Sequence, residues 1–239
     1  MKKKIFEAVV CILFAGVLTL SSAYYTVYGT YGIGIDYSEE YAGISQDTVL
    51  ATVNEKELTA DLYAYWLTYY DQMVYSIYDG GESEVNWDMT YDQTLGVTLG
   101  EYVKSAAMQT AATFLLIEDK AQEYEVTLSD EQLTELSSWE SEQVEAYGQE
   151  GFYTQLKESS CSAELMLYMN KVNMLYENLA DSLLGEDADT DSDEMNEILQ
   201  EWMSEADAEL TDEYSGYDIE LFYDNLIENL SSIDPDTYS

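Results

Sequence analysis

The sequence contains no histidine and no arginine, and these absences exclude many kinds of site. Without imidazole, the chain cannot form Ser-His-Asp or Cys-His catalytic groups, HExxH zinc sites or most transition-metal sites. Without guanidinium, it lacks the bidentate donor that phosphate-binding sites commonly use. Carboxylate chemistry remains, but a glycosidase needs two buried, pre-positioned acids, and no strand-end or barrel pattern supplies them. We therefore expect no enzyme activity, no cofactor and no metal.

Positive charge of any kind is scarce. The 239 residues include 8 lysines against 49 Asp and Glu, which gives a formal net charge of −41, and three of the lysines are Lys2, Lys3 and Lys4. Such a surface repels nucleic acid and anionic lipid. We expect no nucleic-acid partner.

Cysteine is also rare, because only Cys11 and Cys161 are present. Cys11 lies in the apolar N-terminal stretch, so cleavage of that stretch would leave Cys161 without an intramolecular partner. No histidine or arginine is available to lower the pKa of Cys161, which favours an inert thiol.

Apolar and aromatic residues are abundant by contrast. Hydrophobic residues make up 46% of the chain, which is sufficient for a buried core, and 23 residues are tyrosine. Tyrosine buries its ring while keeping a polar hydroxyl, and it suits half-buried and contact surfaces.

The N-terminus is typical of an export signal. A lysine cluster precedes the apolar run Ala8–Leu20, and small residues follow at Ser21 and Ala23. Thirteen apolar residues suit a signal peptide and are short for a membrane span, although the interfacial residues to Tyr28 would extend an uncleaved anchor. Residues 1–23 are therefore predicted to be a signal peptide or a membrane anchor. Either alternative places the body on the extracellular side of a bacterial cytoplasmic membrane.

The rest of the chain is predicted to be mostly α-helical, with one short β element near its start. Residues 24–47 are rich in Gly, Tyr and Ser and are expected to be a flexible tether, and 231–239 a tail. Alternating apolar residues over 49–53 and a turn at 54–55 predict a strand or hairpin. Helical periodicity and capping boxes at Thr98 and Ser129 then predict a single helical domain over 48–230. Its expected helices are about 59–78, from 98, from 129, 152–158, 162–184, 193–210 and 219–230.

Two stretches carry a family resemblance, "VLATVNEKELTADLYAYWLTYY" and "LGEYVKSAAMQTAATFLLIEDKAQEYEVTLSDEQL". They resemble the SurA N-terminal, trigger-factor-like chaperone domain of secreted PrsA-type prolyl isomerases, and Glu55 takes the place of that family's usual turn glycine. In such foldases a parvulin domain is inserted before a returning helical segment, which "EILQEWMSEADAELTDEYSGYDIELFYDNL" resembles. The resemblance implies a chaperone fold from which the parvulin domain is missing.

The acidic run "EDADTDSDE", residues 186–194, stands where that insert would be, so 185–193 is predicted to be an exposed acidic loop. A calcium loop would use every second residue from Asp187 to Asp193. It would also need glycine at Ser192 and a bidentate glutamate at Ile198, and both positions fail. A linker that ends by capping the next helix through Ser192 is favoured.

The resulting hypothesis is an exported, non-catalytic holdase that binds unfolded or extended polypeptides. Client-binding candidates are Trp66, Tyr69, Tyr70 and Met73, because aromatic and methionine side chains adapt to varied segments. The alternative is a surface adaptor that binds one folded partner, basic partners included, and isomerase activity at another site stays open. If the insert is missing, the apolar residues of 193–230, Trp202 and Phe222 among them, should fold back onto the N-terminal helices.

Overall fold

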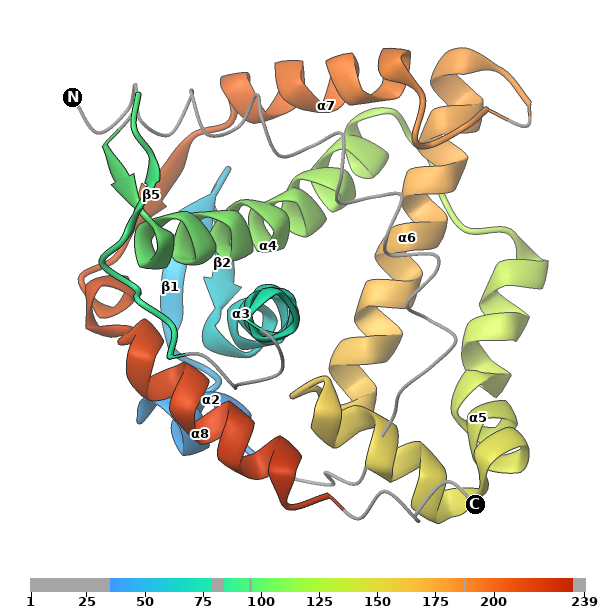
Figure 1. Cartoon of the computed structure of the whole chain (residues 1–239). Coiled ribbons are helices and arrows are strands. Elements are labelled where there is room, and N and C mark those ends of the chain that lie inside the picture. The colour runs from blue at the N-terminus through green and yellow to red at the C-terminus, as the bar shows by residue number, and fades with distance from the viewer. Residues whose placement is uncertain (1–34, 79–83, 95, 187, 234–239) are drawn as a thin grey trace.

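The computed structural model describes residues 35–78, 84–94, 96–186 and 188–233. These residues form a mostly α-helical fold with small antiparallel sheets, which confirms the predicted fold class (Figure 1). The predicted signal or anchor segment, the first part of the predicted tether, Asp187 and most of the tail lie outside the described residues. Within the described ranges, no helix combines the length and the apolar character needed to cross a bilayer.

The hairpin expected near the start is present and belongs to a three-stranded sheet. Strand β1 (Val49–Val53) pairs antiparallel with β2 (Lys56–Thr59), and β5 (Ala208–Leu210) pairs with the other edge of β1. Asn54 and Glu55 make the tight turn with φ of 48° and 68°. Two successive positive φ values are typical of a hairpin turn that favours Asn-Gly.

Replacing Glu55 by glycine is expected to stabilise the protein. Relief of the left-handed conformation should gain about 1–2 kcal/mol, and the greater freedom of unfolded glycine should offset about 0.5–1 kcal/mol of that gain. A rise of a few degrees in the melting temperature, measured by calorimetry, is expected. The control Glu57→Gly, in the neighbouring strand, should lower the melting temperature instead.

Two helices form the centre of the body. Helix α3 (Ala60–Ile77) follows the hairpin directly, and α4 (Leu99–Glu123) packs against α3 and also contacts α6, α7 and α8. Figure 1 views α3 along its axis while α4 lies across the page, so the two helices cross steeply. The predicted capping box is confirmed, because Thr98 and Glu101 each accept a hydrogen bond from the other's backbone N–H. Strands β3 (Thr90–Asp92) and β4 (Val97–Thr98), which precede α4, were not predicted.

A long helix on the outside of the molecule follows. Helix α5 (Asp130–Glu158) starts at the predicted capping box of Ser129 and Gln132. Gly148 interrupts it with φ 72° and ψ 161°, a conformation that is almost restricted to glycine. The predicted separate short helix is therefore the part of α5 beyond this break. Helix α6 (Ala163–Leu184) returns alongside, and Figure 1 shows α6 between α5 and the centre of the body.

The C-terminal segment differs from its prediction in one respect. Helix α7 (Asp193–Glu205) ends at Ala206, whose φ of −61° and ψ of 136° turn the chain into β5. The expectation of a helix to Leu210 is therefore wrong, because the helix ends at Glu205 and residues 208–210 form strand β5. A 3-10 turn, η2 (Glu213–Gly216), and helix α8 (Ile219–Ser231) complete the chain.

This segment folds back onto the N-terminal helices, as predicted. The ring centroid of Trp202 lies 6.0 Å from that of Tyr124, and Tyr223 of α8 lies 5.2 Å from Trp87. Helix α8 contacts both α3 and α4, and one core includes side chains from all these elements. The first and last thirds of the body therefore share their buried interior.

The part of the predicted tether that the structure describes is not a tether. Helix α2 (Tyr37–Ala42) is capped by Asp36 and packs against α8. Tyr41 is 1% exposed, and its backbone carbonyl accepts a hydrogen bond of 3.0 Å from Asn225. The stretch lacks a long apolar period because a helix of six residues needs only two or three buried side chains.

Candidate functional site

The structure separates the four predicted client-binding residues. Trp66 and Tyr70 are 6% and 5% exposed and belong to the core. The Trp66 ring lies 5.4 Å from Phe114, and the Tyr70 hydroxyl lies 3.0 Å from that of Thr110. These two residues are not accessible to a client in this conformation, and their role in client binding stays a prediction. In the sequence, aromatic residues of the core look the same as aromatic residues of a contact surface. The face of α3 that holds Trp66 and Tyr70 is turned towards α4.

Tyr69 and Met73 lie at the surface of α3. Tyr69 is half-buried, Met73 is 36% exposed, and Ile77, one further turn along, is 71% exposed. Positions four residues apart share a helix face, so the three side chains form one short apolar stripe. Helical spacing alone does not reveal the exposure of Ile77, because it lies on the same turn pattern as the buried Trp66 and Tyr70.

Further exposed and half-buried apolar residues occur on α5 and on α6, which packs beside it. We define the α5–α6 surface by residues that are exposed or half-buried: Leu133, Leu136, Trp139, Val144 and Tyr147 on α5, and Leu167 and Met174 on α6. Gln132 and Asn178 exchange two side-chain hydrogen bonds, of 3.0 and 2.9 Å, at the start of α5. The sequence signal for the exposure of the α5 stripe is the high density of acidic and serine residues around it.

Carboxylates of the two helices interact electrostatically at this surface. Glu135 on α5 acts electrostatically on Glu177 of α6, as does Asp181 one turn further along α6. Partial burial raises the pKa of Glu177, and Glu135 and Asp181 raise it further. Like charges therefore meet where α5 packs on α6.

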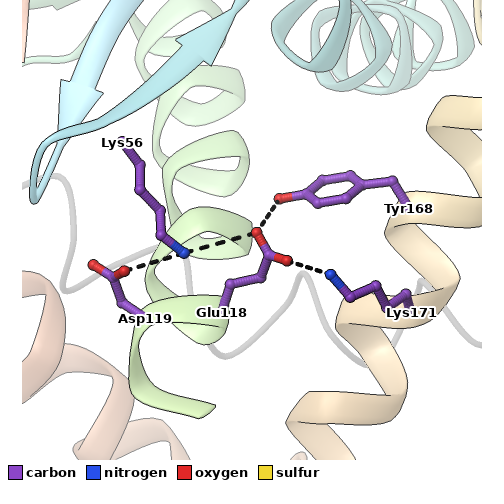
Figure 2. A network of polar contacts seen from close by, with 5 residues as sticks. All are labelled: Lys56, Glu118, Asp119, Tyr168 and Lys171. Carbon is purple, nitrogen blue, oxygen red and sulfur yellow. Dashed lines mark hydrogen bonds and ion pairs between the residues drawn. The ribbon is translucent and has the colours of Figure 1, made fainter. Parts of the chain in front are cut away.

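Two lysines of the body, Lys56 and Lys171, form ion pairs with acidic residues of α4. Figure 2 shows Lys56 from β2 and Lys171 from α6 reaching Glu118 from opposite sides. The Lys171 ammonium lies 2.7 Å from Glu118, and Lys56 lies 3.8 Å from Glu118 and 3.1 Å from Asp119. Tyr168 donates a hydrogen bond of 3.2 Å to the same Glu118 carboxylate. This network joins the sheet, α4 and α6 through ion pairs.

Two further lysines of α4 also reach neighbouring elements. Lys104 donates to the carbonyl oxygen of Tyr217, and Lys120 lies 5.7 Å from the ring centroid of Trp202. These contacts attach η2 and α7 to α4. Four of the lysines of the body, Lys56, Lys104, Lys120 and Lys171, therefore join neighbouring elements through α4.

Replacing Glu118 by glutamine is expected to destabilise the protein by about 1 kcal/mol, because two ion pairs of a partly buried carboxylate are lost. The midpoint of urea unfolding measures this effect. Glu57→Gln removes the same charge from an exposed position of β2 and should leave the midpoint unchanged. An equal shift in both variants would show that net charge, and not the network, is responsible.

The acidic run acts as a connection between α6 and α7 in its described part. Ser192 accepts a hydrogen bond of 3.2 Å from the Met195 N–H, which confirms it as the cap of α7. The Tyr176 hydroxyl donates to the carbonyl oxygen of Thr190 at 3.0 Å, which ties the loop to α6. Among the described residues, no group of three or more His, Cys, Asp or Glu is arranged to hold a metal ion.

Cys161 is fully buried, and burial raises the pKa of its thiol well above the ordinary value. The thiol therefore stays protonated at neutral pH, in agreement with the predicted inert role.

Comparison with protein-family models, with curated proteins and with solved structures found no match to this chain. The resemblance to the SurA N-terminal domain stays a prediction from the quoted motifs.

Proposed function

We propose that this protein is an exported, non-catalytic chaperone that holds unfolded or extended polypeptides on the α5–α6 surface. The observation that carries the proposal is the exposure of large apolar side chains there. Leu133 is 52% exposed, Tyr147 48% and Leu167 37%, and half-buried apolar residues lie beside them. Clustered apolar exposure of this kind marks interaction surfaces.

The form of α5 also supports the proposal. Its packing is mainly on α6, and Gly148 breaks the helix beside Tyr147. A helix with few buried contacts rearranges at low cost, because local stability follows local packing. Met174 adds a side chain that fits clients of different shape. Binding of varied segments needs this adaptability more than a fixed pocket.

The test is suppression of aggregation of a reduced, unfolded protein by stoichiometric amounts of this chain. Replacing Leu133 and Tyr147 together by serine should reduce suppression by about half or more, because a few apolar residues dominate such contacts. The control replaces Leu210 and Leu221, which are 53% and 48% exposed but lie on β5 and α8. The control should suppress as the wild type does, and all variants should keep their urea midpoints.

Failure of the folded wild type to suppress aggregation would reject the holdase. Suppression that survives loss of Leu133 and Tyr147 but falls with Met73→Ser would move the site to the α3 stripe. The adaptor alternative predicts one stoichiometric folded partner whose binding unfolded competitors do not displace. A prolyl-peptide isomerisation rate above background would overturn the non-catalytic assignment.

A further inference from the structure

The α5 part of the α5–α6 surface combines apolar exposure with unpaired negative charge. The sequence has no lysine, arginine or histidine between Lys120 and Lys157, nor after Lys171. Lys120 and Lys171 are paired with Glu123 and Glu118, and Lys157 lies on α5 beyond the Gly148 break. In the described part of the chain, none of the acidic residues of α5 between Asp130 and Glu150 forms an ion pair with a lysine.

The charges and the apolar residues share the same helix face. Leu133, Leu136, Glu140, Val144 and Tyr147 are spaced by three or four residues, so they follow one side of α5. The exposed carboxylate of Glu140 therefore stands within the apolar row. Any segment that covers the row must bury or approach this carboxylate.

The seam, which we define as the Glu135, Glu177 and Asp181 carboxylates between α5 and α6, adds further negative charge beside the apolar row. Glu135 of α5 and Asp181 of α6 both act electrostatically on Glu177 of α6, and none of the three forms an ion pair within the described residues. A bound positive group would replace this repulsion by attraction, whereas a bound negative group would increase it. Solvent-exposed charges interact over about 10 Å at 0.1 M salt, so a ligand on the apolar row lies within their range.

We propose that the α5–α6 surface selects unfolded segments that carry lysine or arginine next to apolar residues. The inference rests on the proposed function and names its client class. Apolar side chains of the client cover Leu133, Leu136 and Tyr147, and its cations pair with Glu140 and with the seam carboxylates. Acidic segments and nucleic acids are rejected by the same charges.

The experiment uses the full chain and three labelled peptides of equal length and equal apolar content. The peptides carry lysines, serines or glutamates at the same alternate positions, and fluorescence anisotropy gives the dissociation constants. The lysine peptide should bind about tenfold more tightly than the serine peptide at low salt, and the glutamate peptide more weakly than both. The advantage of the lysine peptide should shrink as salt is raised.

Matched variants locate the charge effect. Glu135→Gln combined with Glu140→Gln should remove most of the advantage of the lysine peptide and leave binding of the serine peptide unchanged. The control pair, Glu57→Gln with Glu209→Gln, removes the same net charge from exposed positions of the sheet and should preserve the advantage. An equal loss in both pairs would show attraction by net charge alone and would overturn the site.

The other outcomes are distinct. Equal binding of all three peptides, together with suppression of aggregation, would leave the proposed function standing and overturn the inference. Absence of both peptide binding and suppression would reject the proposed function itself. Binding of a folded basic protein as tightly as the lysine peptide would overturn selection of unfolded segments and favour the adaptor.

Discussion

Replacing Phe222 by alanine is expected to lower the free energy of unfolding by about 3–5 kcal/mol. The side chain is fully buried on α8, with ring centroids 5.4 Å from Tyr41 and 6.1 Å from Tyr217. Truncation removes its transfer free energy and leaves a cavity where α2, α8 and the turn η2 meet. The midpoint of urea unfolding, followed by circular dichroism, measures the loss.

The neighbouring residue supplies the control. Leu221 is 48% exposed, so Leu221→Ala should change the free energy of unfolding by less than about 0.5 kcal/mol. Should Phe222→Ala fail to fold, Phe222→Leu keeps most of the volume and should cost about 1–2 kcal/mol. A midpoint for Phe222→Ala equal to that of Leu221→Ala would contradict the docking of α8 described above.

Replacing Asp71 by asparagine is expected to stabilise the protein at neutral pH, by roughly 1–3 kcal/mol. Asp71 is fully buried on α3, and within the described residues neither carboxylate oxygen has a hydrogen-bond partner. Burial raises its pKa well above the usual value. Tyr63 of the same helix and Tyr223 of α8 lie within electrostatic range. Both are neutral at pH 7, because burial raises the pKa of Tyr223 to about 12 and that of Tyr63 well above its usual value.

The sign of the pH dependence follows from this shift. Between the unfolded pKa of about 4 and the raised folded pKa, the folded state binds one more proton at Asp71 than the unfolded state does. Its contribution to stability therefore falls as pH rises through this range. The advantage of Asp71→Asn should be largest at neutral pH and vanish below about pH 4. The control Asp88→Asn, at an exposed position, removes the same charge and should show no such pH-dependent gain.

The sequence predicted the helices and their starts well because those signals are local. Capping residues such as Thr98 and Ser129 act within one turn, and the apolar period of α4 repeats over its whole length. Strand β5 was missed because three exposed residues gain their conformation by pairing with β1, far away in sequence. The turn of α2 into the core was missed for the same reason, since Tyr37 and Tyr41 are buried by α8 and its neighbours.

The candidate site was only partly predictable. Trp66 and Tyr69 are three residues apart on α3, yet α4 covers the first more fully than the second. Periodicity assigns residues to faces of a helix, but it does not say which faces find a partner. Periodicity alone therefore does not distinguish the stripe of α5 from a core stripe. Leu133 and Tyr147 are accessible because α5 has limited packing on α6.

The pairing of β1 with β5 has a consequence for the order in which the molecule assembles. It joins Thr52 to Glu209, so one edge of β1 has no partner until almost the whole chain has been synthesised. Contacts between such distant residues require closure of a long loop, whose entropy must be lost before the contact stabilises anything. High contact order slows folding. We expect the nascent chain to stay open until residues 208–231 emerge and then to close in a late, comparatively slow step.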